Sequence, residues 1–321
     1  MKGVVLMARP KNNSQPKDDW QAIAECFYEM KESQGVAPRT LSEYRYHIER
    51  FFNHTGASMS DCQQLRRAVT RYFAESARLA PSTYNIHRKQ LKAFFTWAVS
   101  EKFLPESPMA HIRKREENAA VRGVDIDVIR RLLALPNRRT FAGLRDFALL
   151  VFTMDTGARP SEAFSLLLQS FDFRSMEVTI DAASAKTRTS RTLPLSPVTV
   201  EVVKNLVAKR HPSWGENVPV FCTENGTALT RFVWWKRLDS YGKELGTKIR
   251  PYDLRHSFAL NYLRQGGNAF GLQRTLGHSS MAMTRRYVNL THLDLKQLHS
   301  TASPLSRLLT RVARVRNLKA E

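Results

Sequence analysis

The residues best suited to chemistry lie near the end of the chain, in the stretches PYDLRHSFAL and LGHSSMAMTRRY. They place an arginine (Arg255), a histidine (His278) and a tyrosine (Tyr287) within about 35 residues of one another. Pro251 suits the first turn of a helix and Gly277 suits a left-handed helix end. The spacing predicts short helices joined by tight turns, which bring a guanidinium, an imidazole and a phenol together, with Tyr287 on the last helix.

A second arginine would complete a site for phosphodiester chemistry. Breaking a DNA backbone without a metal requires a nucleophile, cationic donors to the non-bridging oxygens, and an acid for the leaving oxygen. Arg159, in TGARPSEA, follows an apolar helix, where an unpaired guanidinium would be costly. Glu162 can hold it in place, and a phosphate can take its remaining donors. A helix-turn-helix-like piece of core with surface basic residues is the alternative for the Tyr252–Tyr287 stretch.

The remaining parts of such a reaction can be assigned to residues of suitable type. Arg255 is the second candidate for binding the phosphate, and Tyr287 is the candidate nucleophile. His278 can donate to the pentavalent transition state. Lys186 lies in the basic stretch DAASAKTRTS, between two short strand patterns, from which it can reach the leaving 5′-oxygen.

The charge of the chain indicates a polyanionic ligand. The 321 residues hold 50 Lys and Arg against 29 Asp and Glu, a formal net charge of +21. Residues 1–120 contribute +6 (19 against 13) and residues 121–321 contribute +15 (31 against 16), so both halves are basic. A basic chain that is 42% hydrophobic predicts a folded protein that binds nucleic acid. An anionic membrane is the weaker candidate, because no lipid signal or basic amphipathic anchor stands out.

The elements that must position these residues form two domains, mainly helical, with a small antiparallel sheet in the C-terminal one. We expect a flexible basic arm (1–17), a helical DNA-binding domain (18–110), a linker (111–123), a second domain (124–300) and a C-terminal helix (301–321). The first domain is predicted to be a four-helix bundle. In the second, residues 176–180 and 191–195 are predicted strands, and residues 144–154 a buried helix.

DNA-facing groups of the first domain are predicted at helix starts, where backbone N–H groups, hydroxyls and basic side chains suit phosphate contacts. Solvated helix faces are the alternative for each of them. The candidates are Arg39, Thr40, Tyr44, Arg45, Thr83, Tyr84, Asn85, Arg88 and Lys89, and Arg188 in the second domain.

The cysteines Cys26, Cys62 and Cys222 are scattered and form neither a CxxC nor a Cys/His metal spacing. They are expected to be reduced thiols in a cytosol-like compartment. No apolar run approaches the ~18 residues of a membrane helix. We therefore expect a cytoplasmic, nucleoid-associated protein without metal or cofactor. Met7 is an alternative start, which N-terminal sequencing would test.

Five short stretches, in order, resemble motifs of the tyrosine recombinase, or phage integrase, family. They are TGARPSEA, the hairpin sequence KTRTSRTLPL, YDLRHSFA, LGHSS and the late tyrosine in TRRYVNL. The corresponding family motifs are TGxRxSE, a hairpin lysine, HxxR, LGH and a tyrosine shortly after. Their order and spacing agree over about 140 residues. The N-terminal helices also resemble the core-binding domain of the family, so the resemblance covers nearly the whole chain.

The resemblance implies a role for each matching residue. Arg159 and Arg255 would clamp the scissile phosphate, Lys186 would protonate the leaving 5′-oxygen, and His278 would stabilise the phosphorane. Tyr287 would attack and form a 3′-phosphotyrosyl bond, from which a 5′-hydroxyl can rejoin the DNA without ATP. The resemblance also implies double-stranded DNA as partner, a homotetramer on two duplexes, accessory recombination proteins, exchange of the C-terminal helix between protomers, and no metal.

Three positions depart from the family pattern. Tyr252 stands where HxxR has its histidine, and a phenol is a poor base at neutral pH. Either Tyr252 only positions the phosphate, or another group or water takes the proton from Tyr287. Asn289 stands where the family often has a histidine, and Pro160 where an aliphatic residue is more frequent.

The prediction is a site-specific recombinase or integrase, with a mobile element as the expected setting. A non-catalytic DNA-binding protein on the same scaffold is one alternative, with Tyr252 as a sign of decay. A type IB topoisomerase-like relaxing enzyme is another, because it shares the tyrosine chemistry but not the assembly. A helix-turn-helix regulator is weaker, since it would leave Lys186 and Arg159 unexplained.

Overall fold

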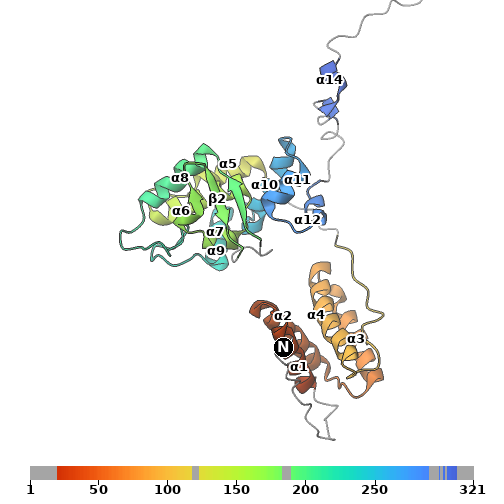
Figure 1. The fold of residues 1–321 in the computed structure, drawn as a ribbon. Helices are drawn as coiled ribbons and strands as arrows, with labels where there is room; N and C mark the ends of the chain where they lie inside the picture. Colours follow the sequence, from red (N-terminus) through yellow and green to blue (C-terminus); the bar gives the residue numbers. More distant parts are fainter. Residues whose placement is uncertain are drawn as a thin grey trace, which may run out of the picture. The chain divides into compact units, whose positions relative to one another are not determined.

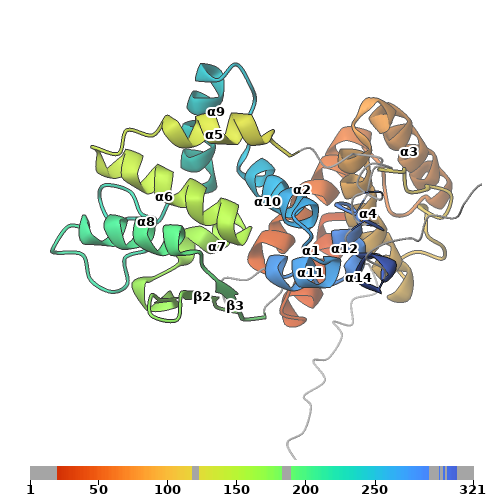
Figure 2. The ribbon, with the colours of Figure 1, turned by 90° about the horizontal axis from the view of Figure 1, so that it is seen from above.

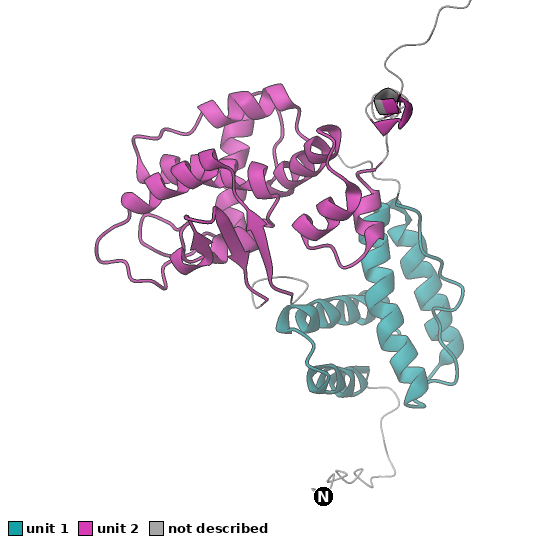
Figure 3. Ribbon diagram, turned by 45° about the horizontal axis from the view of Figure 1, so that its top comes forward, with its two compact units in different colours: residues 1–119 teal, residues 120–321 magenta. Residues whose placement is uncertain are grey.

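The computed structural model describes residues 20–117, 123–182, 189–288, 296, 299–300 and 302–308 (Figure 1). The chain divides into two compact units, residues 1–119 and 120–321 (Figure 3). Among the described residues helices predominate, and the sheet is small and antiparallel, which confirms the predicted fold class. No helix in these ranges is both long and apolar enough to cross a membrane.

The first unit is a bundle of α1 (Trp20–Ser33), α2 (Pro38–Thr55), α3 (Cys62–Glu75) and α4 (Pro81–Ser100), with a 3-10 turn η1 (Ser76–Arg78) after α3. Proline occupies the first turn of α2 and α4, where its missing N–H costs nothing. The Asp61 carboxylate caps α3 by accepting from two backbone N–H groups. The core is rich in aromatic rings, among them Phe27, Phe51, Phe52, Phe94 and Phe95.

The segment predicted to be a linker begins as part of this bundle. Ile112 is buried in the bundle core. The Arg115 guanidinium lies 4.0 Å from the Tyr84 ring centroid and donates to the Ala77 carbonyl at 2.7 Å. The sequence did not predict that this segment packs on the bundle, because a single apolar residue among polar and basic ones gives no periodic signal.

The central helix of the second unit is α6 (Phe141–Thr156), which is longer at both ends than the predicted helix. It contacts α5 (Ile126–Ala134), α7 (Pro160–Ser165), α8 (Pro197–Ala208) and α10 (Pro251–Arg264) (Figure 2). Helix α9 (Arg231–Glu244) packs against α10. Because α6 is surrounded by other helices, most of its residues are buried, including the ion-paired Arg145 and Asp146.

The sheet has the order β1-β2-β3, with antiparallel pairing throughout. Its strands are β1 (Phe171–Asp172), β2 (Glu177–Ile180) and β3 (Arg191–Pro194). Both predicted strands are present, whereas the two-residue β1 was too short to predict. Buried Val178 pairs with buried Leu193, and Ile180 pairs with Arg191, so Arg191 opens β3.

The C-terminal part contains α11 (Ala269–Leu276), α12 (Met281–Arg285) and α14 (Leu305–Leu308). The prediction that Tyr287 lies on the last of the three short helices was wrong by two residues. Helix α12 ends at Arg285, and the Tyr287 N–H closes a tight turn onto the Thr284 carbonyl at 2.9 Å. Of the predicted C-terminal helix, α14 is described and exposes Leu305 and Leu308; residues 309–321 lie outside the described residues.

Candidate active site

The turn between α6 and α7 positions the first arginine of the site. Gly157 ends α6 with φ +63°, and a Cβ there would lie 2.3 Å from the Phe258 ring, so both conformation and space require glycine. Arg159 then occupies the N-cap position of α7, and its backbone N–H donates to Glu162 Oε2 at 2.8 Å. The same carboxylate therefore fixes both the turn and the side chain that emerges from it.

Two guanidinium groups converge on the fully buried Glu162. Arg159 Nη1 donates to Glu162 Oε1 at 2.8 Å, and Arg191 Nη2 donates to Oε2 at 2.7 Å. A further Arg191 donor, Nη1, reaches Oε1 at 3.2 Å. Burial raises the pKa of Glu162, but the hydrogen bonds and charges of the two arginines outweigh it and lower that pKa overall. The carboxylate is therefore ionised at neutral pH.

A third guanidinium, that of Arg255 on α10, is buried beside the first two. It donates to the Gly157 carbonyl at 2.7 Å and to the Leu276 carbonyl at 2.6 Å. Burial and the neighbouring Arg159 lower the pKa of Arg255 to about 10, so it stays charged at neutral pH.

All three arginines bind carbonyls at the C-terminal end of α11. Arg191 donates to the carbonyl of Thr275 at 3.1 Å, Arg255 to that of Leu276, and Arg159 to that of Gly277 at 3.1 Å. The C-terminal end of a helix carries partial negative charge, which favours cations there. Gly277 (φ +61°) also leaves room, because a Cβ at this position would lie 3.0 Å from Arg191 Nη1.

The charge of this cluster does not balance. Three guanidinium groups face one carboxylate, so the cluster has a net charge of +2, and among the described residues no second carboxylate pairs with it. A phosphodiester carries one negative charge, and its pentacoordinate transition state carries two. Buried cationic donors of this kind stabilise such charge far better than water does. The cluster therefore fits a phosphate that undergoes nucleophilic attack.

His278 follows the left-handed turn at Gly277 and is held at both ends. Its backbone N–H donates to the Gln273 carbonyl at 3.0 Å, and its Nδ1 lies 2.9 Å from the hydroxyl of the fully buried Thr284. Burial, followed by the charges of Arg255 and Arg159, lowers the pKa of His278 to about 4. The imidazole is therefore neutral at pH 7, and its Nε2 does not contact Thr284.

Tyr287 lies in a small apolar cluster and is 7% exposed. Its ring is nearly parallel to that of His278, at 9° and a centroid distance of 6.3 Å. The phenol oxygen lies 2.8 Å from Nδ1 of His256, on α10. Burial raises the pKa of Tyr287, although the charge of Arg255 opposes this shift, so the hydroxyl is protonated at neutral pH.

A groove of about 1130 Å³ opens beside the cluster, within the second unit. It is lined by β3 and α11 and includes both Arg191 and His278. Phe270 is 77% exposed on its α11 side. Within the described residues, no three His, Cys, Asp or Glu side chains are grouped as ligands of a metal ion.

The structure brings together five of the residues predicted for catalysis or its support: Arg159, Glu162, Arg255, His278 and Tyr287. Lys186 and Arg188 lie outside the described residues, in the segment that joins β2 to β3. Tyr252 is half-buried on α10, with its ring centroid 6.4 Å from that of His256 and 5.4 Å from the Arg231 guanidinium carbon.

Sequence reasoning missed Arg191, His256 and Thr284. Arg191 entered the prediction only as the first residue of the strand 191–195, and its place at the start of β3 lets its side chain reach Glu162. His256 follows Arg255 directly and lies one helical turn after Tyr252. That i,i+4 spacing was the available signal for a second imidazole near the nucleophile. Thr284 carried no signal of its own.

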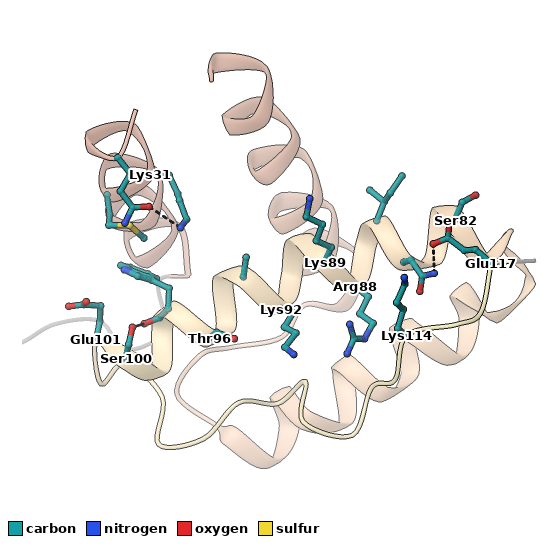
Figure 4. A pocket seen from close by; sticks show the side chains of 16 residues that line it. Lys31, Ser82, Arg88, Lys89, Lys92, Thr96, Ser100, Glu101, Lys114 and Glu117 are labelled. Atoms are coloured by element: carbon teal, nitrogen blue, oxygen red, sulfur yellow. Dashed lines mark hydrogen bonds between the residues drawn. The ribbon is translucent and has the colours of Figure 1, made fainter. Parts of the chain in front are cut away.

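The first unit carries a basic groove of about 1000 Å³ along α4 (Figure 4). The basic side chains that line it outnumber the acidic ones, Glu101 and Glu117. The basic ones are Lys31, Arg88, Lys89, Lys92 and Lys114.

The predicted DNA-facing residues of this unit differ in what they already bind. Asn85 donates to the Arg115 carbonyl and Arg88 to that of Ile112, each at 2.8 Å. Tyr84 is buried. Two others pack against α1: Tyr44 meets the Phe27 ring edge-to-face, and Arg45 pairs with Glu25. Arg45 and Arg39 are exposed although each pairs with a glutamate, and Thr83 and Lys89 are also exposed, while Thr40 is half-buried.

Known proteins share both the sequence pattern and the fold. Residues 123–293 match the phage integrase family, and residues 25–102 match the phage integrase N-terminal SAM-like domain. Tyrosine recombinase XerC of Escherichia coli O157:H7 is 26% identical over 279 residues, which are 85% of this chain and 92% of XerC. Tyrosine recombinase XerD of Listeria innocua is 26% identical over 283 residues, 84% of this chain and 94% of XerD.

Two solved structures show the same fold at low sequence identity. The Tn1549 transposon integrase, in complex with a circular intermediate DNA, superposes with a TM-score of 0.68 at 16% identity, over 89% of this chain and 99% of that one. A lambda integrase dimer bound to a COC′ core site gives 0.66 at 15% identity, over 82% and 96%. The chain belongs to the phage integrase family and is a DNA breaking and rejoining enzyme of the tyrosine recombinase type.

Proposed function

We propose that this recombinase cleaves its target DNA by attack of the Tyr287 oxygen on a phosphate bound by Arg159 and Arg255. The observation that carries this proposal is the surplus of two positive charges in the arginine cluster, next to a buried tyrosine. A structural ion-pair network would gain nothing from that surplus, whereas a transition state with two negative charges is stabilised by it.

His278 is proposed to donate from Nε2 to a non-bridging oxygen of the phosphorane. A neutral imidazole has one donor nitrogen, and the partner of the other nitrogen decides which it is. If the Thr284 hydroxyl donates to Nδ1, the proton of His278 lies on Nε2. Thr284 would then be a positioning residue that selects the donor tautomer. Lys186 is the proposed acid for the leaving 5′-oxygen, and Tyr252 the proposed support beside the nucleophile.

The assembly and setting are also proposals. The two solved structures are DNA complexes, one of them of a dimer, and double-stranded DNA is the proposed substrate here. We infer a homotetramer on two duplexes, accessory recombination proteins, and exchange of residues 301–321 between protomers. Arg39, Thr83, Lys89 and the basic groove along α4 would contact DNA phosphates, which would place the enzyme on the nucleoid in the cytoplasm.

Covalent trapping tests the chemistry directly. The full-length protein is incubated with DNA that contains its target, denatured, and examined for a protein–DNA adduct, with Tyr287→Phe as the control. An adduct that the wild type forms and Tyr287→Phe does not would support the proposal. DNA binding without an adduct would favour the non-catalytic interpretation, and relaxation of supercoils without strand exchange would favour a topoisomerase-like enzyme.

The proposed mobile-element setting needs a separate measurement. The adduct sites can be mapped by sequencing across the DNA that surrounds the gene. Sites at both ends of a mobile segment would support it. A single site in unrelated chromosomal DNA would instead indicate resolution of chromosomes.

A further inference from the structure

The proton of the Tyr287 hydroxyl must leave when its oxygen attacks phosphorus, and the family position for a nearby imidazole holds Tyr252 instead. The structure places another imidazole on that hydroxyl: Nδ1 of His256 lies 2.8 Å from the phenol oxygen. We propose that His256 is the base that takes this proton. The inference rests on the proposed role of Tyr287 as nucleophile.

The position of His256 on α10 suits this role. It is the residue after Arg255, so one short segment of helix supplies both a phosphate donor and the proposed base. It lies one turn after Tyr252, and its ring centroid is 5.7 Å from that of Tyr287 and 6.4 Å from that of Tyr252. His256 thus extends from the same helix as Tyr252 and contacts the nucleophile directly.

Burial, together with nearby positive charge, keeps the ring of His256 neutral at pH 7. Asp253 and Arg255 face it from α10, and Arg286 and Tyr287 face it from the turn after α12. Burial lowers the pKa of His256 first; Asp253 opposes this, and Arg286 and Arg255 add to it, so the pKa lies below its usual value. A neutral imidazole can accept a proton at Nδ1, and the raised pKa of Tyr287 means that it needs such an acceptor.

His278 is the other imidazole beside the nucleophile, and it fits the role less well. Its Nδ1 already contacts the Thr284 hydroxyl, and its ring lies parallel to the phenol. Burial, followed by the charges of the cluster arginines, lowers the pKa of His278 to about 4, which makes it a poor base at neutral pH. These contacts suit a donor to the phosphate.

Cleavage would take one proton from the nucleophile and give one to the leaving oxygen. A lone pair on the Tyr287 oxygen forms the O–P bond, the O–H bond breaks, and its proton passes to His256 Nδ1. The bond from phosphorus to the 5′-oxygen breaks, and that oxygen takes a proton from the acid proposed at Lys186. In the rejoining step the 5′-hydroxyl returns its proton to Lys186, and the imidazolium of His256 protonates the departing tyrosine oxygen.

The test uses His256→Gln in the full-length protein, because a glutamine carbonyl can accept the hydrogen bond but cannot take the proton at neutral pH. The probe is a nicked duplex that carries the cleavage site mapped with the wild type. We expect adduct formation to fall about 100-fold or more at pH 7. The matched control is His211→Gln, on the surface of the same unit, which should cleave at the wild-type rate.

The pH profile separates a base from a residue that merely packs. The rate of wild-type cleavage should decrease at pH values below the lowered pKa of His256 and should stay level from pH 7 to 9. Cleavage by His256→Gln depends on the small fraction of ionised Tyr287, so its rate should rise about tenfold per pH unit. The difference between the wild-type and variant rates should therefore narrow as the pH rises. A substrate with a 5′-phosphorothiolate at the cleavage site has a leaving thiolate that needs no proton. This substrate should restore the cleavage rate of Lys186→Ala, whereas cleavage by His256→Gln should remain slow.

Three results would overturn the inference. Cleavage by His256→Gln at the wild-type rate would show that this ring takes no proton. A loss that stays constant from pH 7 to 9 would show a structural role. Rescue of His256→Gln by the phosphorothiolate would place its proton at the leaving group. Failure of the wild type itself to form an adduct would instead overturn the proposed function, and the inference with it.

Discussion

Two buried carboxylates of the second unit, Asp146 and Glu162, each bind two arginines. The Asp146 cluster stabilises the fold, whereas the Glu162 cluster is the one proposed to bind an anion. Asp146 Oδ1 accepts from Arg145 Nη2 at 2.7 Å, and Oδ2 accepts from Arg237 Nε at 2.6 Å and from the Tyr241 hydroxyl at 2.8 Å. These bonds tie α6 to α9.

The difference lies in where the excess positive charge resides. In the Asp146 cluster, the Arg237 side chain is 40% exposed, so water solvates the charge that Asp146 does not balance. In the Glu162 cluster, Arg159 and Arg191 are 6% and 9% exposed, and buried Arg255 adds a third cation. Desolvated positive charge is costly unless an anion is bound, which supports the proposal that this cluster receives a phosphate.

The largest expected effect contrasts Arg255→Lys with Arg237→Lys. An ammonium keeps the charge but loses the planar fork that binds two carbonyls, so cleavage by Arg255→Lys should fall about 100- to 1000-fold. Arg237→Lys should leave the cleavage rate per folded molecule unchanged. Single-turnover adduct formation measures both. Equal losses in the two variants would remove the distinction between the clusters.

Neutralising the carboxylates should separate stability from catalysis. Asp146→Asn leaves Arg145 buried without its anion and is expected to lower the free energy of unfolding by about 3 kcal/mol. Denaturant unfolding followed by circular dichroism measures this change. Cleavage by the folded fraction of Asp146→Asn should match the wild type, whereas Glu162→Gln should lose both stability and cleavage. A catalytic defect of Asp146→Asn at temperatures where it is folded would contradict this division.

The contribution of Glu162 to the free energy of unfolding should decrease at acid pH. The folded-state pKa of Glu162 lies below its ordinary value of 4.5, so its stabilising contribution is complete above pH 4.5 and is lost as the pH falls through the folded-state pKa. Glu162→Gln, which does not titrate, should show a flatter fall in unfolding free energy below pH 4.5. Denaturant titrations between pH 3 and 6 measure the slopes, and identical slopes would indicate that other carboxylates dominate.

The smallest expected effect concerns Thr284. Thr284→Val removes the hydroxyl that contacts His278 Nδ1 while keeping a similar shape, so about a tenfold loss in adduct formation is expected. Thr284→Ser retains the hydroxyl and should recover most of the rate. The two variants differ in one polar atom, which makes their ratio a measure of tautomer control. Equal rates would mean that the phosphate itself orients His278.

Much of the fold follows from local sequence. Spaced apolar residues predicted the four helices of the bundle, and Gly277 predicted the end of α11, because these signals depend on contacts within a few residues. The boundaries were less accurate: α6 is longer at both ends than predicted, and Tyr287 lies two residues beyond α12. The start of the predicted linker packs on the bundle through Ile112, for which the sequence offered no periodic signal.

The sequence by itself determined the inventory of the site: two arginines, a histidine and a late tyrosine in motifs whose order identifies the family. Only the tertiary structure decided how they are paired. Arg255 donates to Gly157, 98 positions away, and Arg159 to Gly277, 118 positions away, and such contacts exist only once α6, α10 and α11 pack together. For the same reason the sequence did not indicate a role for His256, because only the folded structure shows that its ring contacts the Tyr287 hydroxyl.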